Sequence, residues 1–332
     1  MLDKMKPYCL FPRTPGLFSS LNVQKDMLKD NERINKFKET IFKNVKKGDI
    51  VIDLGTGTGI LAIWAAQAGA KKVYAIEETD VAELAKSVVK ANGYESTIDI
   101  IQANSSEITL PEKADVLIAE LIGHFIFEEG IVEYVVDARN NLLKPDSKLI
   151  PSKAIISLAP VSLGSAFTEV SYWDTWKDPD LSSIKKRASN SAYVEIIYKE
   201  NSLSRPGELF TIDFASIQKN VFQAECSFLI ERDGYLDAFA GWFRLNLDSD
   251  IYIDTSPWAE TTHWKQTIFP LENPLLVNIG DKIKFDMIIE PFGAGSKWKW
   301  AFKMIKNNKE VREVHVIPVL YDKSFRLMTE RF

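Results

Sequence analysis

A short apolar run followed by a glycine-rich turn places the strongest constraint on the fold of this 332-residue chain. Val51–Leu54 predicts a buried strand and Ile60–Ala68 predicts a helix. Between them lies Asp53-Leu-Gly55-Thr-Gly57-Thr-Gly59, whose glycines let the backbone approach a ligand closely. This order predicts the first unit of a parallel α/β sheet, with the free N–H groups of the helix start turned toward a ligand.

The spacing of the glycines favours one kind of cofactor. A dinucleotide-binding turn has the pattern G-x-G-x-x-G, and Ile60 stands where its third glycine would be. Glycines at alternate positions after Asp53 suit S-adenosylmethionine (SAM), which has no pyrophosphate to hold. Glu77 ends the next predicted strand, where an acid accepts hydrogen bonds from ribose hydroxyls. A plain tight turn between strand and helix is the alternative interpretation.

Apolar runs alternate with helical patterns through the first half of the chain. An N-terminal helix is predicted over 23–45. Further strands are predicted at 73–76, 98–101 and 116–119, and further helices at 81–90 and 128–143. This alternation predicts an α/β fold with a doubly wound, mostly parallel, Rossmann-like sheet. We assign 1–48 to an N-terminal segment with its covering helix and 49–150 to the SAM-binding domain.

The pattern changes after Pro151. From Ala154 onward, long alternating segments with turn signals such as Arg232-Asp-Gly234 predict a mostly antiparallel β barrel or sandwich. A polar, helical stretch at about 172–198 interrupts this pattern. We therefore expect residues 151–332 to form a β domain that carries a helical arm.

Composition excludes several classes of protein. Hydrophobic residues make up 45% and charged residues 26%, which is typical of a globular protein, and the net charge of −5 does not favour nucleic acid as a partner. Two cysteines and three histidines give no disulfide framework and no zinc pattern, so no metal is expected. No apolar run reaches the length of a membrane span. A reducing cytoplasm is the expected location.

Two glutamates nine positions apart, Glu120 and Glu129, mark the candidate active site. Glu120 follows the apolar run 116–119, and ligands bind at this end of parallel strands. Gly123 permits a tight reversal before Glu129 opens the next predicted helix. Two carboxylates across a short loop fit the forked donors of a guanidinium better than an ammonium. The alternative for Glu129, and the expectation for Glu128, is an exposed acid favoured at a helix start.

Three further segments resemble one family. The segment 23–30 followed by Arg33 looks like a SAM-covering helix. Thr262-His263-Trp264 looks like a threonine-histidine-tryptophan loop, and 239–243 resembles the strand before it. Together with the glutamate spacing, these segments make the chain similar to the protein arginine methyltransferases from about 17 to about 280.

The resemblance implies a role for each matching residue. The residues implied to bind or face SAM are Met27, Arg33, Asp53, Gly55, Gly57, Glu77 and Ser106. Among these, Arg33 would pair with the SAM carboxylate and Glu77 with its ribose.

On the acceptor side, Glu120 and Glu129 would bind the guanidinium, and Asp30 would hydrogen-bond His263. Trp264 and His124 would line the substrate pocket. The arm at 172–198 would mediate a homodimer.

The departures from the family lie mainly around the acceptor site. Leu17 and Phe18 stand where a tyrosine pair is usual, Leu121 replaces a tryptophan and His124 a tyrosine. Elsewhere, Gln24 replaces a histidine and Ser106 an adenine-contacting glutamate.

These departures bear on the product. We predict monomethylation as the main outcome, because Met27 and the β-branched Ile131 crowd the pocket; the alternative is that the smaller Leu121 leaves room for a second methyl.

Methylation of an arginine guanidinium in a protein or peptide is the leading functional hypothesis. A guanidinium stays protonated at neutral pH, so the enzyme must aim it and accept its proton, either through Glu129 or through the His263–Asp30 pair. Methylation of free arginine or another guanidino small molecule is the alternative. A catalytically silent scaffold is a third hypothesis, and the intact acids and glycines argue against it.

Overall fold

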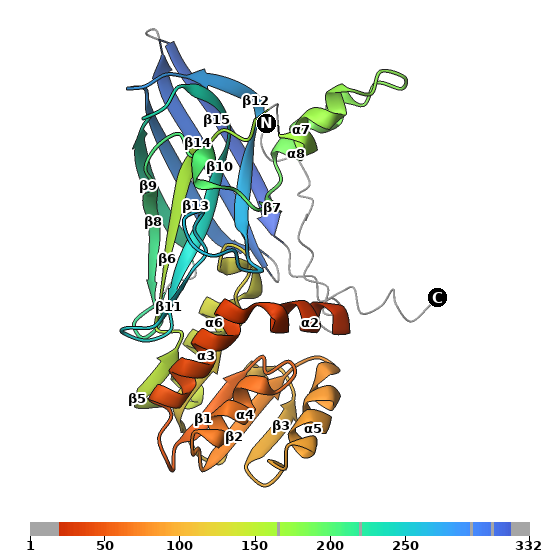
Figure 1. Ribbon diagram of the computed structural model, residues 1–332, viewed down its shortest axis with the longest axis vertical. Coiled ribbons are helices and arrows are strands. Elements are labelled where there is room, and N and C mark those ends of the chain that lie inside the picture. The colour runs from red at the N-terminus through yellow and green to blue at the C-terminus, as the bar shows by residue number, and fades with distance from the viewer. Residues whose placement is uncertain (1–19, 165–166, 219–220, 293–294, 307–308, 320–332) are drawn as a thin grey trace.

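The computed structural model describes residues 20–164, 167–218, 221–292, 295–306 and 309–319. Figure 1 shows an α/β unit at one end of an elongated molecule, a β domain at the other, and a helical arm that projects from the β domain. The helices α2 (Leu21–Lys29) and α3 (Asn31–Asn44) lie between the two units.

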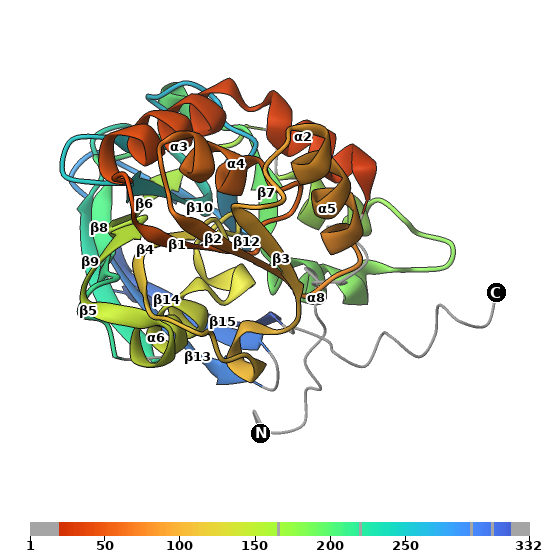
Figure 2. The same ribbon diagram turned by 90° about the horizontal axis from the view of Figure 1, so that it is seen from below.

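The α/β unit contains a five-stranded parallel sheet with the order β3-β2-β1-β4-β5. Its strands are β1 (Ile50–Leu54), β2 (Lys72–Glu77), β3 (Ile98–Gln102), β4 (Ala114–Ala119) and β5 (Leu143–Ile150). Figure 2 shows α3, α4 (Ile60–Gln67) and α5 (Val81–Ala91) on one face of the sheet and α6 (Ile131–Asn141) on the other. The doubly wound fold is therefore confirmed, and the strand order reverses between β1 and β4, where such sheets bind ligands.

The N-terminal helix is not continuous over 23–45 as predicted. It breaks at Asp30, whose ψ of 89° is not helical. The Asp30 side chain accepts a hydrogen bond from the backbone N–H of Arg33 at 3.0 Å and so caps α3. The break matters because it turns Asp30 toward the β domain.

The β domain consists of two antiparallel sheets, in agreement with the sandwich form of the prediction. One sheet has the order β7-β12-β10-β6-β8, with β11 paired to β10, and the other has the order β15-β14-β13-β9. The strands of the first sheet are β6 (Lys153–Val161), β7 (Tyr193–Glu195), β8 (Gly207–Asp213), β10 (Gly234–Asn246), β11 (Tyr252–Asp254) and β12 (Gln266–Val277). Those of the second are β9 (Phe222–Leu229), β13 (Lys282–Phe292), β14 (Gly295–Lys306) and β15 (Lys309–Val319).

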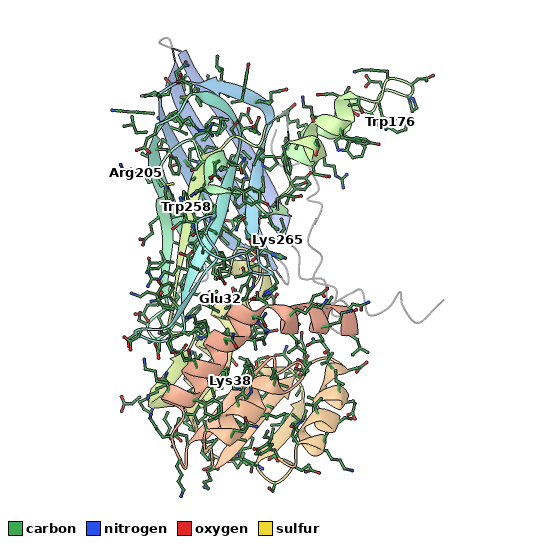
Figure 3. All side chains as sticks on the ribbon, in the orientation of Figure 1. Glu32, Lys38, Trp176, Arg205, Trp258 and Lys265 are labelled. Carbon is green, nitrogen blue, oxygen red and sulfur yellow. The ribbon has the colours of Figure 1, made fainter. Side chains whose placement is uncertain are left out.

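The helical arm is shorter than predicted. It contains α7 (Thr168–Ser171), α8 (Lys185–Ser189) and 3-10 turns at Tyr172–Asp174 and Ser182–Ile184. The last part of the predicted insertion instead forms β7, which pairs with the edge of β12. Trp176 lies toward the outer end of the arm, and its side chain is 44% exposed (Figure 3).

No helix in the described part of the chain is long and apolar enough to cross a membrane.

Candidate active site

A cavity of about 380 Å³ lies where the α/β unit meets α2 and the β domain. Its walls come from the glycine turn after β1, the ends of β2 and β4, the loop between β4 and α6, α2, and the loop before β12. Of the residues predicted to act at the site, those that line it are Met27, Arg33, Gly55, Gly57, Glu77, Glu120, His124, Glu129, His263 and Trp264. Segments far apart in the sequence therefore meet in one cavity.

The glycine turn has the left-handed backbone that its sequence suggests. Gly55 and Gly57 have φ angles of 72° and 53°, a region that costs other residues free energy. A Cβ at Gly55 would clash with the side chain of Leu121, and a Cβ at Gly57 would lie 3.3 Å from Oε1 of Gln24. The turn is therefore built for a close approach between backbone and ligand.

Glu77 is fixed beside this turn. Its Oε2 accepts a hydrogen bond from the backbone N–H of Gly57 at 3.1 Å, and its Oε1 accepts from the N–H and the hydroxyl of Thr79 at 3.0 and 2.7 Å. These contacts hold the carboxylate at the end of β2, where a ribose hydroxyl would donate to it.

Asp53 supports the turn from behind, because it is fully buried and does not line the cavity. Its Oδ2 accepts a 2.5 Å hydrogen bond from the hydroxyl of Thr56, while its Oδ1 has no hydrogen-bond partner. Burial raises the pKa of Asp53 to about 7, although the Thr56 hydrogen bond opposes the shift. Asp53 thus holds the turn, and the prediction that it faces the cofactor is wrong.

Ser106, which the family resemblance implies as a cofactor contact, also does not line the cavity. It is exposed and donates from its hydroxyl to Oδ1 of Asn104 at 2.7 Å, whereas Asn104 and Ser105 line the cavity. Ser105 and Ser106 are adjacent in a short 3-10 turn, so the sequence offers two candidates for a cofactor contact. Only the geometry of the turn shows that Ser105 lines the cavity.

Glu120 is paired with Arg33 inside the cavity. Arg33 donates from Nε to Oε2 of Glu120 at 3.0 Å and also from Nη2 to the same oxygen. Both side chains are 8% exposed. Burial raises the pKa of Glu120, while the charge of Arg33 opposes this shift and Glu129 adds to it. Two carboxylates and one arginine therefore share the acceptor end of the cavity.

The loop between Glu120 and Glu129 is held tightly closed. Gly123 and Ile126 form an isolated β-bridge, and Ile126 has a φ of 72°, which is strained for a β-branched residue. Both carboxylate oxygens of Glu128 accept from the backbone N–H of Phe125, at 2.9 and 3.0 Å. The prediction that Glu128 is merely an exposed helix-start acid is therefore wrong, since it closes the loop that presents Glu129.

Phe125 anchors this loop in the β domain. Its ring lies 5.2 Å from that of Phe269 on β12 and 5.5 Å from that of Trp298 on β14, between centroids. A Cβ at Gly241 on β10 would clash with the same ring. Trp298 thus helps to fix the position of the loop between Glu120 and Glu129, which we call the acid loop.

The predicted contact between Asp30 and His263 is present. Oδ2 of Asp30 accepts from Nδ1 of His263 at 2.7 Å and from its backbone N–H at 2.9 Å. Although burial pushes the pKa of Asp30 upward, the hydrogen bonds from His263 and Arg33 hold it below its usual value. The ionised Asp30 therefore fixes the hydrogen of the His263 ring on Nδ1 and joins the helices to the β domain.

Trp264 and His124 link the two loops at the acceptor end. Trp264 is 1% exposed and donates from Nε1 to the carbonyl of Ile122 at 2.8 Å. In return, the carbonyl of Trp264 lies 2.7 Å from Nδ1 of His124. Hydrogen bonds thus fix the two loops to each other at the acceptor end of the cavity.

One of the residues used to predict the product is placed differently. Met27 and Leu121 line the cavity, but Ile131 is fully buried at the start of α6 and does not. The expected crowding by Ile131 is therefore wrong. Leu17 and Phe18 lie outside the described residues.

Comparison with known proteins agrees with both halves of the structure. Residues 152–297 match the family model of the arginine methyltransferase oligomerization subdomain, and residues 36–161 match that of ribosomal protein L11 methyltransferase. Protein arginine N-methyltransferase 1 of Chlamydomonas reinhardtii is 32% identical over 283 residues, which is 82% of each chain. Protein arginine N-methyltransferase 2 of Xenopus tropicalis is 32% identical over 86% of this chain and 69% of its own.

Solved structures show the same architecture. The Trypanosoma brucei PRMT1 enzyme–prozyme heterotetrameric complex with AdoHcy has a TM-score of 0.83 and 28% identity, covering 91% of this chain and 99% of that one. Arabidopsis thaliana protein arginine methyltransferase 10 has a TM-score of 0.80 and 26% identity, covering 92% and 100%.

The parallel sheet, its glycine turn and the β domain define a SAM-dependent methyltransferase with an appended β domain. Within that class, the chain belongs to the protein arginine N-methyltransferase family.

Proposed function

We propose that this protein transfers a methyl group from SAM to a guanidino nitrogen of arginine in a protein or peptide. One observation carries the proposal: the glycine turn with Glu77 and the acid pair Glu120 and Glu129 open into the same cavity. Cofactor and acceptor would therefore be bound side by side, which is what transfer between them requires.

The residues present fit SAM. The positive-φ glycines, the fixed Glu77 and Arg33 all line the cavity, so that partners for the backbone approach, the ribose and the carboxylate are present. When bound, SAM supplies a methyl group on a sulfonium, which is strongly electrophilic without further activation. The protein's task is therefore positioning rather than strong base catalysis.

The acid pair would perform this positioning. Two carboxylates hold the planar donors of a guanidinium in a fixed orientation and aim one terminal nitrogen. They also draw positive charge away from that nitrogen, so its lone pair becomes more available. Glu129 and His263, which is hydrogen-bonded to Asp30, both line the cavity, so these are the two groups that would take the proton released during transfer.

Incubation with isotope-labelled SAM, followed by mass spectrometry, tests this function. An arginine-rich peptide, free arginine and a cell lysate would be compared, with Glu129→Gln as the matched inactive control. We expect label on peptide arginine, read out as mono- or dimethylarginine after hydrolysis. Label on free arginine alone would replace the proposed substrate, and no label on any of the three would overturn the function.

The helical arm would mediate a homodimer. It projects from the β domain (Figure 1) and exposes Tyr172 and Trp176 at 49% and 44%. The same region matches the oligomerization subdomain model, and an isologous contact is the commonest solution for such a surface. Sedimentation should give a dimer for the full chain and a monomer after deletion of 168–190. A wild-type monomer at micromolar concentration would contradict this.

A cytoplasmic location is part of the proposal. It rests on the two cysteines without a pairing pattern, which suit a reducing compartment. Fractionation of cells that express the tagged chain would test it.

A further inference from the structure

The acid loop turns twice between Gly123 and Phe127. The first turn is a β-turn, in which the backbone N–H of Ile126 donates to the carbonyl of Gly123 at 3.2 Å. In the second turn the N–H of Phe127 donates to the carbonyl of Phe125 at 2.9 Å. Ile126, between these two residues, has a φ of 72° and a ψ of −49°. This hydrogen bond and these angles define a γ-turn of the rare, strained kind, in which the central residue has a positive φ.

Other contacts must offset the strain of this turn, because a β-branched residue otherwise avoids a positive φ. Ile126 is fully buried, and the ring of Phe125 packs against Phe269 and Trp298, so both side chains are held. Glu128 acts on the backbone of the turn itself. Its two carboxylate oxygens accept from the N–H of Phe125 at 2.9 and 3.0 Å, immediately before the strained residue.

Gly123 gives Glu128 the room to make this contact. A Cβ on Gly123 would overlap Oε2 of Glu128 and would lie 2.7 Å from its Cβ. The φ of Gly123 is not positive, so the close approach of Glu128, and not the backbone conformation, explains the glycine. The loop is therefore shaped to admit the Glu128 side chain.

The direction of the chain after the γ-turn decides where Glu129 lies. Glu129 ends the 3-10 turn Phe127–Glu129, which begins directly after Ile126. Glu120, at the other end of the loop, is fixed by its contact with Arg33. A return of Ile126 to a negative φ would redirect the chain that follows and move Glu129 relative to Glu120. The two acids can hold one guanidinium between them only while the γ-turn persists.

We propose that Glu128 is a positioning residue that keeps the γ-turn at Ile126 in place and thereby holds Glu129 opposite Glu120. Glu128 does not line the cavity, so it acts through the backbone N–H of Phe125 and not on the substrate. This inference rests on the proposed methyltransferase function, since it gives Glu128 a part in orienting the acceptor guanidinium.

Removing the carboxylate at position 128 tests this role. In Glu128→Ala the N–H of Phe125 loses its acceptor, and we expect kcat/KM for an arginine-rich peptide to fall by about ten- to a hundredfold, the range for a hydrogen bond to a charged group. The affinity for SAM, measured by calorimetry, should stay at the wild-type value. Glu128→Gln keeps one acceptor oxygen and should retain most of the activity. Glu133→Ala removes an exposed acid outside the cavity and controls for the lost charge.

A matched pair of substitutions at Ile126 separates backbone strain from packing. Ile126→Ala and Ile126→Gly both remove the buried side chain, but only glycine adopts a positive φ without strain. While Glu128 is present the two variants should have similar kcat/KM values, because the turn is held. When each is combined with Glu128→Ala, the glycine variant should be about tenfold more active, in keeping with the cost of a left-handed φ.

Hydrogen exchange followed by mass spectrometry observes the loop without any turnover. Peptides that cover 121–130 should exchange faster in Glu128→Ala than in the wild type, whereas Glu128→Gln should resemble the wild type. Peptides from α5 serve as an internal reference and should exchange equally in all three proteins.

The outcomes distinguish this inference from the function beneath it. A wild type that methylates no guanidine would overturn the proposed function, and the exchange of the loop would still decide whether Glu128 holds the turn. An active wild type whose Glu128→Ala variant keeps its kcat/KM or its slow loop exchange would overturn only the role of Glu128. An equal ratio between the glycine and alanine variants with and without Glu128 would do the same.

Discussion

Arg33 donates two hydrogen bonds to a single oxygen of Glu120, and its Nη1 also donates to the carbonyl of Met27 at 3.2 Å. One guanidinium thus joins α2, α3 and the end of β4. The family resemblance assigns Arg33 to the SAM carboxylate and Glu120 to the substrate. The contact between them means that the cofactor and acceptor sites share a wall.

Removing one partner of this buried pair should be costly. We expect Arg33→Ala to lower the free energy of unfolding by about 3–5 kcal/mol, because Glu120 is then buried without its cationic partner. Arg33→Ala combined with Glu120→Gln should lose less than the sum of the single changes, since the amide needs no cation. Urea unfolding of the four proteins measures this, and strict additivity would contradict it.

Cofactor binding should depend on the glycine turn. Gly57→Val combines a positive φ with a side chain that meets Gln24, so we expect no measurable SAM binding by calorimetry. Glu77→Ala should weaken binding, since each lost hydrogen bond is worth about 0.5–3 kcal/mol. Gly93→Ala has a comparable φ of 74° but open space around it, and lies outside the cavity. It controls for backbone strain, and equal SAM affinities in all three variants would remove the proposed cofactor site.

The acid pair should be essential for transfer and dispensable for SAM. Glu120→Gln and Glu129→Gln should each lose about 10²- to 10³-fold in kcat/KM, which corresponds to about 3–4 kcal/mol. Calorimetry should show SAM affinity close to that of the wild type. Glu133→Gln, on the first turn of α6 and outside the cavity, serves as a charge-matched control. Near-normal turnover in either acid variant would show that Glu120 and Glu129 do not hold the guanidinium together.

The position of the acid loop should depend on the size of the side chains at positions 125 and 241. Gly241→Ala places a methyl group against the ring of Phe125, which should displace the loop and lower kcat with little change in SAM affinity. Adding Phe125→Leu should restore part of the activity, because the smaller side chain accommodates the methyl group. A double variant no more active than Gly241→Ala alone would mean that the loop is not positioned through Phe125.

The buried Asp53 should make stability depend on pH. Its pKa is raised to about 7 by burial, from an ordinary value of 3.8. The folded state therefore holds the proton more tightly than the unfolded state, and stability should fall as pH rises from about 4 to about 7. Asp53→Asn has no such proton, so its stability relative to the wild type should increase between pH 5 and pH 8. Parallel unfolding curves at both pH values would contradict the raised pKa.

Local sequence determined much of the fold, because the positions of the strands and helices follow from the periodicity of nearby apolar residues. The strands β1 to β4 and the helices α4 and α5 appear within a residue or two of their predicted bounds, since apolar runs and glycine stops are local signals, whereas β5 was not predicted. The break at Asp30 was missed because helical periodicity continues across it. At this break the Asp30 side chain caps α3 and also accepts a hydrogen bond from His263, 233 positions away, a contact that local periodicity does not encode.

The candidate site likewise contains some residues that the sequence identifies and others that only the structure identifies. Glu120, Glu129, Glu77 and the glycines were identifiable from spacing and residue type, because their chemistry requires those types at the ends of strands. The roles of Glu128, Phe125 and Trp298 were not, since each depends on a contact that only folding creates.

By itself, the sequence determined which chemistry is present: a glycine turn for SAM, two carboxylates for a guanidinium, and a β domain to carry an arm. Only the tertiary structure decided how these parts are held. The pairing of Arg33 with Glu120 and the contact of His124 with Trp264 follow from distances between segments that spacing along the chain does not define. Hydrogen bonds and packing act over a few ångströms, so the partners become known only when the strands and loops are placed in space.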